Sequence, residues 1–127
     1  MANWWGETLH DGLRIQLRVN KLLHETKSKY QHLMLFENDT MGRVLTLDGI
    51  IQTSEHDEFI YHEMLTHTPI LAHGIVRSVL IIGGGDGGIL RRVLMHQGVK
   101  HVVMVEIDVR VIDLCRKYLF SNSNLSK

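Results

Sequence analysis

The chain has 127 residues, the size of one domain or of two small lobes. Fourteen basic and fourteen acidic residues give a formal net charge of zero, so charge favours neither nucleic acid nor an anionic membrane as a partner. The lone Cys115 excludes an intrachain disulfide, and the apolar runs, such as Val79 to Ile82, are far shorter than the ~20 residues of a membrane-spanning helix. The N-terminus also lacks a signal-peptide pattern. These features predict a soluble, cytoplasmic protein that binds neither nucleic acid nor a membrane.

The first lobe is predicted to be an antiparallel β meander over residues 7–54. Residues 13–19 alternate apolar and polar side chains, which is typical of a half-buried strand. Residues 33–36, 44–47 and 50–53 are further predicted strands. The last two flank Asp48-Gly49, a pair that favours a two-residue type I′ hairpin turn.

The pattern then changes to alternating helices and strands. Residues 54–58 supply a cap and first-turn acids for a helix, and Pro69 disfavours helical geometry at Thr68, where the helix is predicted to end. The remaining predicted elements are a strand at 79–82 covered on both faces, a helix at 89–94 ended by Gly98, a strand at 102–107, a helix at 109–119 and a polar tail at 121–124.

The cysteine and two basic pairs lie on predicted helices, and their positions predict whether they are buried or exposed. Cys115 lies on an apolar stripe and is predicted to be a buried core thiol. The basic pairs Arg91-Arg92 and Arg116-Lys117 are predicted to lie on solvated helix surface.

A glycine-rich loop, residues 83–88, follows the predicted strand at 79–82. Its sequence GGGDGG satisfies G-x-G-x-x-G, with Gly83 and Gly85 as the first two glycines, and Glu106 follows Gly88 by 18 residues at the tip of the next strand. An acid there accepts hydrogen bonds from ribose hydroxyls in dinucleotide-binding folds. The loop therefore predicts a nucleoside site, the alternative being a tight turn.

Asp86 indicates which kind of nucleoside fits. It lies at a helix N-terminus, where a dinucleotide would place its pyrophosphate, and a carboxylate there repels phosphate. A ligand with a sulfonium or ammonium near the ribose, such as an S-adenosylmethionine-like molecule, would be attracted instead. The alternative is that Asp86 only caps the helix.

His62 and His67 resemble a zinc-protease signature but fail it, because Thr66 occupies the position of the second histidine. Five residues apart on a helix, the two histidines point ~140° away from each other, so no metal site is predicted. Tyr61 and His62 form a polar cluster with Asp57 and Glu58. This cluster either faces an amine ligand or lies on a solvated helix face, and the spacing leaves both interpretations open.

Taken together, these motifs resemble the spermidine synthase family of polyamine aminopropyltransferases. The matching segments are Asp48-Gly49 with Gln52-Thr53, residues 57–64 (DEFIYHEM), residues 83–88 and residues 104–108 (MVEID). The resemblance implies a β domain over residues 1–56, often involved in oligomer contacts and so in a homo-oligomer. It implies an α/β methyltransferase-like Rossmann domain, a doubly wound sheet present in part, over residues 57–127.

The resemblance also implies an activity and roles for residues. An aminopropyl group passes from decarboxylated S-adenosylmethionine, a co-substrate and not a bound cofactor, to putrescine, giving spermidine and methylthioadenosine. By position Gln31, Gly83, Gly85 and Glu106 would bind the nucleoside donor. Three residues would meet the amine groups: Tyr61, His62 and Asp86.

Two parts of the family pattern are missing. The proton-accepting aspartate and the acids beside the adenine would lie beyond Lys127, and only strands 1 and 2 of the order 3-2-1-4-5 are present, with unpaired edges. We therefore expect the chain alone to be inactive. Relatives usually carry glutamate at the position of Arg92. The charge is reversed in this chain, so the local ion pair of the family is not expected here. The alternatives are an oligomerisation or split-enzyme subunit and a small nicotinamide-dependent oxidoreductase.

Overall fold

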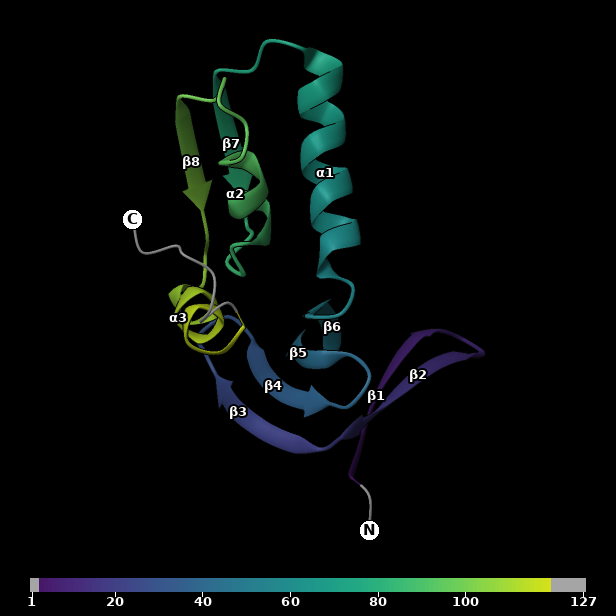
Figure 1. Cartoon of the computed structure of the whole chain (residues 1–127). Helices are drawn as coiled ribbons and strands as arrows, with labels where there is room; N and C mark the ends of the chain where they lie inside the picture. The colour runs from purple at the N-terminus through teal and green to yellow at the C-terminus, as the bar shows by residue number, and fades with distance from the viewer. Residues whose placement is uncertain (1–2, 120–127) are drawn as a thin grey trace. The chain divides into compact units, whose positions relative to one another are not determined.

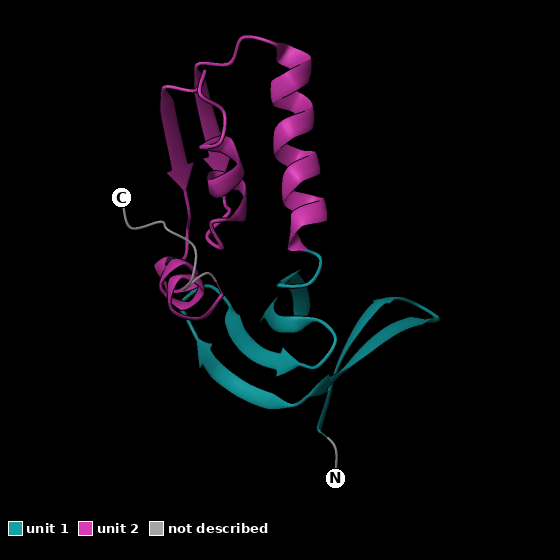
Figure 2. Ribbon diagram, in the orientation of Figure 1, with its two compact units in different colours: residues 1–57 teal, residues 58–127 magenta. Residues whose placement is uncertain are grey.

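The computed structural model describes residues 3–119, so the predicted polar tail at 121–124 lies outside the described residues. The chain divides into two compact units, residues 1–57 and residues 58–127 (Figure 2). No helix in the described part of the chain is long and apolar enough to cross a membrane.

The first unit is an antiparallel meander, as predicted (Figure 1). A two-stranded ribbon precedes a four-stranded sheet of order β3-β4-β5-β6. The strands are β1 (Asn3–His10), β2 (Leu13–Val19), β3 (Lys21–Lys27), β4 (His32–Asn38), β5 (Gly42–Leu47) and β6 (Ile50–Ser54). The strands β1 and β3 were not predicted, because neither shows a sustained alternation of apolar and polar side chains.

The turn between β5 and β6 has the predicted type I′ geometry. Asp48 and Gly49 have φ values of 50° and 77°, and positive φ at both central residues defines this turn. Asp48 also binds the start of β4, since its Oδ1 accepts a hydrogen bond from the backbone N–H of His32 at 2.8 Å.

The core of this unit joins the ribbon to the sheet. Val19, Phe36 and Val44 form its buried centre, and Trp5 packs on Phe36 with ring centroids 5.9 Å apart. The buried Glu7 accepts a 3.0 Å hydrogen bond from the backbone N–H of Ile51. Both contacts hold the ribbon against the sheet.

The prediction that residues 13–19 form a half-buried strand is correct for the strand but wrong for its burial. Leu13 and Ile15 are exposed, Leu17 is half-buried, and only Val19 is buried. The strand belongs to a two-stranded ribbon, so only its Val19 end reaches the core of the four-stranded sheet.

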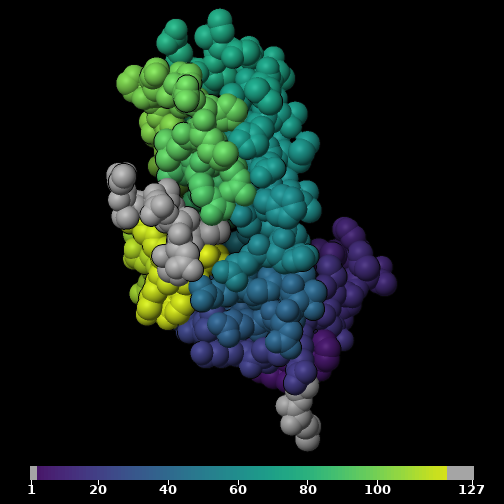
Figure 3. Space-filling view, in the orientation of Figure 1, coloured from purple at the N-terminus to yellow at the C-terminus, as the bar shows by residue number. Residues whose placement is uncertain are grey.

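The second unit begins with a long helix and continues as a βαβα series (Figure 1). Its elements are α1 (Glu58–His73), β7 (Ser78–Ile82), α2 (Gly88–Val93), β8 (His101–Val105) and α3 (Val109–Tyr118). The strands β7 and β8 pair in parallel, with Ile82 opposite Val105. Side chains of α1 pack directly on those of α2 (Figure 3).

The helix α1 does not end at Thr68, so that prediction is wrong. Pro69 lies inside the helix, which continues to His73. A proline removes one backbone donor, but it does not stop a helix whose remaining hydrogen bonds and packing persist. The actual stop is Gly74, whose φ is 86° and whose N–H binds the carbonyl oxygen of Ile70 at 3.1 Å.

The prediction that Gly98 stops the next helix is also wrong, because α2 ends five residues earlier, at Val93. The N–H groups of Met95 and His96 bind carbonyl oxygens three residues back, at Arg92 and Val93. Such bonds tighten the chain into turns and end the α-helical ladder.

The strand β7 is covered on one face only, contrary to the prediction. Leu80 and Ile82 are 61% and 83% exposed, and Val103 and Val105 of β8 are exposed beside them. Ile81 on the opposite face is buried. Within residues 3–119 the two strands pair only with each other, so their outer edges are unpaired as expected.

Candidate functional site

The glycine-rich loop lies at the carboxyl ends of both parallel strands. Gly83, Gly84 and Gly87 have φ values near 80°, in the left-handed region that favours glycine. The N–H of Gly83 binds the carbonyl oxygen of Val105 at 2.8 Å, which ties the start of the loop to the end of β8. In open α/β sheets this edge is where ligands bind.

Glu106 follows β8 and points its carboxylate into this loop. Its Oε2 accepts the Gly85 N–H at 2.9 Å, and its Oε1 accepts the Asp108 N–H at 3.0 Å. Each oxygen keeps a second lone pair. A Cβ on Gly85 would lie 2.8 Å from Oε2, so any larger residue would displace the Glu106 carboxylate from this position. The loop backbone therefore orients the carboxylate to accept two further donors.

Asp86 takes part in two polar contacts. Its Oδ1 accepts the Gly88 N–H at 2.8 Å, and its Oδ2 lies 3.3 Å from Nε2 of His62. The N-cap position of α2 is Gly87, which has no side chain to cap with. The carboxylate therefore supports the first turn of α2, as the capping interpretation predicts, and is at the same time fixed by a histidine.

His62 is a buried residue, so the solvated-face interpretation is wrong for it. It is 1% exposed and lies between Glu58, which binds its Nδ1, and Asp86, which faces its Nε2. A Cβ on Gly88 would lie 2.0 Å from the ring, so the loop admits this histidine only because Gly88 has no side chain. Tyr61, by contrast, is exposed and contacts the His62 ring edge-on.

The two arginines that were predicted to lie on solvated surface pair instead with Glu58. Nη2 of Arg91 and Nη2 of Arg92 lie 2.6 Å and 3.2 Å from its Oε1. Arg92 is buried and also lies 3.9 Å from Glu63, so it makes ion pairs of its own. Arg116 and Lys117 are exposed, as predicted.

Glu58 was predicted as a first-turn acid and as part of a polar cluster with His62, but not as the centre of this network. The signal was present, because Glu58 and His62 are four residues apart on a helix and so share a face. The arginine partners come from α2, about thirty residues later, and no local pattern predicts that contact.

The network keeps its carboxylates ionised. Burial alone would raise the pKa of Asp86, but hydrogen bonds from His62 and the Gly88 N–H, with the charges of His62 and Arg91, outweigh it and lower the pKa. Burial likewise opposes ionisation of Glu58, yet His62, Arg91 and Arg92 lower its pKa. Burial would lower the pKa of His62, whereas Asp86 and Glu58 together raise it.

Two other predicted residues take separate positions. Cys115 is buried, as predicted, and burial, together with the charges of Asp86 and Glu106, raises the pKa of its thiol to about 12. That pKa disfavours the thiolate a nucleophile needs. Gln31 lies in the first unit, in the β3–β4 connection, where its backbone binds Ser28; its role in the donor site stays a prediction.

Comparison with known proteins covers both units. Residues 3–55 match the family model of the spermidine synthase tetramerisation domain, and residues 58–125 match that of the spermine/spermidine synthase domain. The chain is 57% identical over 118 residues to the polyamine aminopropyltransferase of Pseudomonas syringae pv. tomato, covering 93% of this chain and 41% of that protein. It is 57% identical over 117 residues to polyamine aminopropyltransferase 1 of Pseudomonas aeruginosa, covering 92% and 41%.

The solved structures give the same match. The crystal structure of spermidine synthase from Thermotoga maritima superposes with a TM-score of 0.90 at 43% identity, covering 95% of this chain and 43% of that one. A spermidine synthase in complex with the transition state analogue AdoDATO gives the same TM-score and identity. The chain spans about two fifths of the length of these relatives.

Proposed function

Because the chain belongs to the spermine/spermidine synthase family, we propose that its second unit binds the nucleoside donor of an aminopropyl transfer. The donor is decarboxylated S-adenosylmethionine, and the acceptor is putrescine. In this proposal Glu106 holds the ribose hydroxyls, Gly83 and Gly85 allow the nucleoside to approach the loop backbone, and Asp86 attracts the ammonium of the aminopropyl group.

The observation that carries the proposal is the position of Asp86 at the start of α2, within hydrogen-bond distance of both His62 and the Gly88 N–H. Its carboxylate is fixed by His62 and the Gly88 N–H, and its pKa is lowered, so it stays negative at neutral pH. A negative charge at this end of the loop repels a pyrophosphate and attracts a cationic donor. The same charge opposes the nicotinamide-dependent alternative.

The reaction is a nucleophilic substitution at the carbon attached to sulfur. The putrescine nitrogen forms a bond to that carbon while the carbon–sulfur bond breaks, and the electron pair leaves with methylthioadenosine. The amine must be neutral to attack, so its surplus proton has to pass to a base. The family resemblance assigns that base to a segment outside these 127 residues, and we propose that the chain alone does not turn over.

Tyr61 and His62 take different parts in this proposal. His62 is buried between two carboxylates, so it holds Asp86 and has no surface to offer the diamine. Tyr61 is exposed on the same turn of α1, and its ring is the one that can pack against an aliphatic amine.

The first unit supplies the proposed contacts between copies of the chain. The matching family model is a tetramerisation domain. Its ribbon exposes large apolar side chains, among them Trp4, Leu13 and Ile15, which are suited to an interface. We propose a homo-oligomer assembled through this unit.

The test is a product assay on the folded chain. It is incubated with decarboxylated S-adenosylmethionine and putrescine, and spermidine and methylthioadenosine are measured by mass spectrometry. We expect no product from the chain alone and both products when the remaining segment of an intact relative is added. Product from the chain alone would show that another residue acts as base, and no product after complementation of a formed complex would refute the proposed role.

A further inference from the structure

Two histidine rings meet in the second unit, at a place separate from the glycine loop. Nδ1 of His67, on α1, lies 2.8 Å from Nε2 of His96, in the turn after α2. The ring centroids are 5.0 Å apart with the planes tilted by 51°. Within residues 3–119 neither ring makes another side-chain hydrogen bond.

The two rings are held in place by the fold. His67 lies on the helix that packs against α2. The turn that carries His96 is fixed by backbone hydrogen bonds, because His96 N–H binds the Val93 carbonyl oxygen at 3.1 Å and Val99 N–H binds the His96 carbonyl oxygen at 3.0 Å. Both rings are half-buried. A ligand that binds both therefore has few side-chain rotamers left to order.

We propose that His67 and His96 form a two-nitrogen site for a divalent transition-metal ion, with Zn²⁺, Ni²⁺ and Cu²⁺ as the ions it would take. Neutral imidazole nitrogen is a preferred ligand for all three. Metal–nitrogen bonds of about 2.0–2.1 Å at a tetrahedral angle place two nitrogens about 3.3 Å apart. To reach that spacing the rings must separate by about half an ångström from their present contact, and each must turn so that its lone pair points at the ion instead of at the other ring.

Binding of the ion needs no other reactant to take up the proton that the two rings share. In the hydrogen-bonded pair of neutral rings, one facing nitrogen carries a proton and the other accepts it. When the ion binds, both facing nitrogens donate lone pairs to it, and the proton moves to the outer nitrogen of the same ring. At acidic pH protons compete with the metal for the same nitrogens, so binding weakens.

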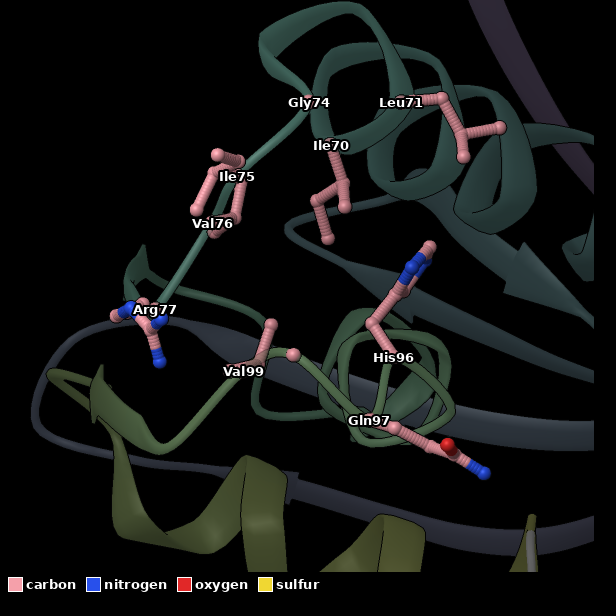
Figure 4. Close-up of a pocket in the computed structure, with 10 residues that line it drawn as sticks. Ile70, Leu71, Gly74, Ile75, Val76, Arg77, His96, Gln97 and Val99 are labelled. Atoms are coloured by element: carbon pink, nitrogen blue, oxygen red, sulfur yellow. The ribbon is translucent and has the colours of Figure 1, made fainter.

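A hollow lies beside His96, one of the two proposed ligands. His96 lines a cavity of about 280 Å³ together with Ile70, Arg77 and Val99 (Figure 4). Water molecules there can complete the coordination of the ion. The cation of Arg77 at the same hollow opposes a dication, so we expect a weak, exchangeable site in which Cu²⁺ binds more tightly than Ni²⁺ or Zn²⁺.

The test uses the whole chain without a histidine tag. ZnSO₄ is titrated while the ring resonances of the nine histidines are followed by NMR. We expect the His67 and His96 signals to shift together and saturate at one ion per chain. The variants His67→Gln and His96→Gln, which keep a polar side chain at each site, should each weaken Zn²⁺ binding at least ~tenfold.

The matched control is His73→Gln, which removes an exposed histidine from the same helix and should leave Zn²⁺ binding unchanged. A chain that shows no saturable shift at His67 and His96 would overturn the proposal. So would Gln variants that fold and bind Zn²⁺ as the unaltered chain does, because the ion would then occupy other histidines.

Discussion

Among single residues, Gly85 and Gly88 of the loop leave the space that the side chains of Glu106 and His62 occupy. A Cβ on Gly85 would meet the Glu106 carboxylate at 2.8 Å, and one on Gly88 would meet the His62 ring at 2.0 Å. Neither residue has a left-handed φ, so the need for glycine comes from close approach. The motif predicts glycine here, but which side chains come close is visible only in the structure.

The substitution Gly88→Ala should displace His62 from its place between two carboxylates. Leaving those charges without their partner should cost about 2–4 kcal/mol of unfolding free energy, measured by urea denaturation. Gly98→Ala is the control, because a Cβ there meets only the Val76 carbonyl oxygen, at an ordinary 3.5 Å. Equal stability of the two variants would contradict the proposed packing.

His62 should make stability depend on pH in a defined direction. Its folded-state pKa is raised above 6.5, so its contribution is fully present below 6.5 and is lost as the pH rises through the raised value. The lowered pKa values of Glu58 and Asp86 give a contribution that is present above about 4 and is lost as the pH falls through them.

The measurement is the thermal midpoint between pH 5 and 9. The unaltered chain should lose stability on the alkaline side of this range, and His62→Gln should flatten that decline. A decline of the same size in both proteins would assign it to other groups.

At the scale of elements, the sequence predicts well where one local rule decides. The Asp48-Gly49 turn follows from its two residues alone. Whether the side chains of a strand are buried depends on segments that are distant in the sequence, and their burial was mispredicted for β2 and for β7. Arg91 and Arg92 illustrate the same limit. Their helix pattern predicts that they face solvent, whereas in the structure both form ion pairs with Glu58 on another helix.

Pro69 gives a prediction about α1. It lies four residues before the end of the helix and lacks the N–H that would bind the Leu65 carbonyl oxygen. Pro69→Ala restores that donor and should raise the unfolding free energy by about 1–2 kcal/mol, less than the full helix penalty because alanine also frees the unfolded chain. Unchanged or lower stability, measured by denaturant unfolding, would mean that the proline ring makes packing contacts that offset its cost.

At the scale of the whole molecule, the second unit presents an uncovered apolar sheet face. Leu80, Ile82, Val103 and Val105 are exposed side by side on two strands with unpaired edges. Such a surface favours association. The family motifs predicted the arrangement of the two strands, whereas the exposure depends on which chain segments are present to cover them.

Replacing Ile82 by lysine should therefore reduce concentration-dependent self-association without unfolding the chain. The expected result is a lower weight-average mass by light scattering at the same concentration. Leu71→Lys is the control, because it places the same charge on an exposed position of α1. If both variants lower the mass equally, added charge and not the sheet face is responsible.

A binding measurement shows whether the loop and Glu106 hold the nucleoside of an aminopropyl donor. The folded chain is titrated with methylthioadenosine and, separately, with NADH, while backbone resonances of residues 83–88 are followed by NMR. We expect saturable shifts at these residues with methylthioadenosine, at least ~tenfold weaker methylthioadenosine binding in Glu106→Gln, and no shifts with NADH. Shifts with NADH alone, or methylthioadenosine binding unaffected by Glu106→Gln, would refute the proposed donor site.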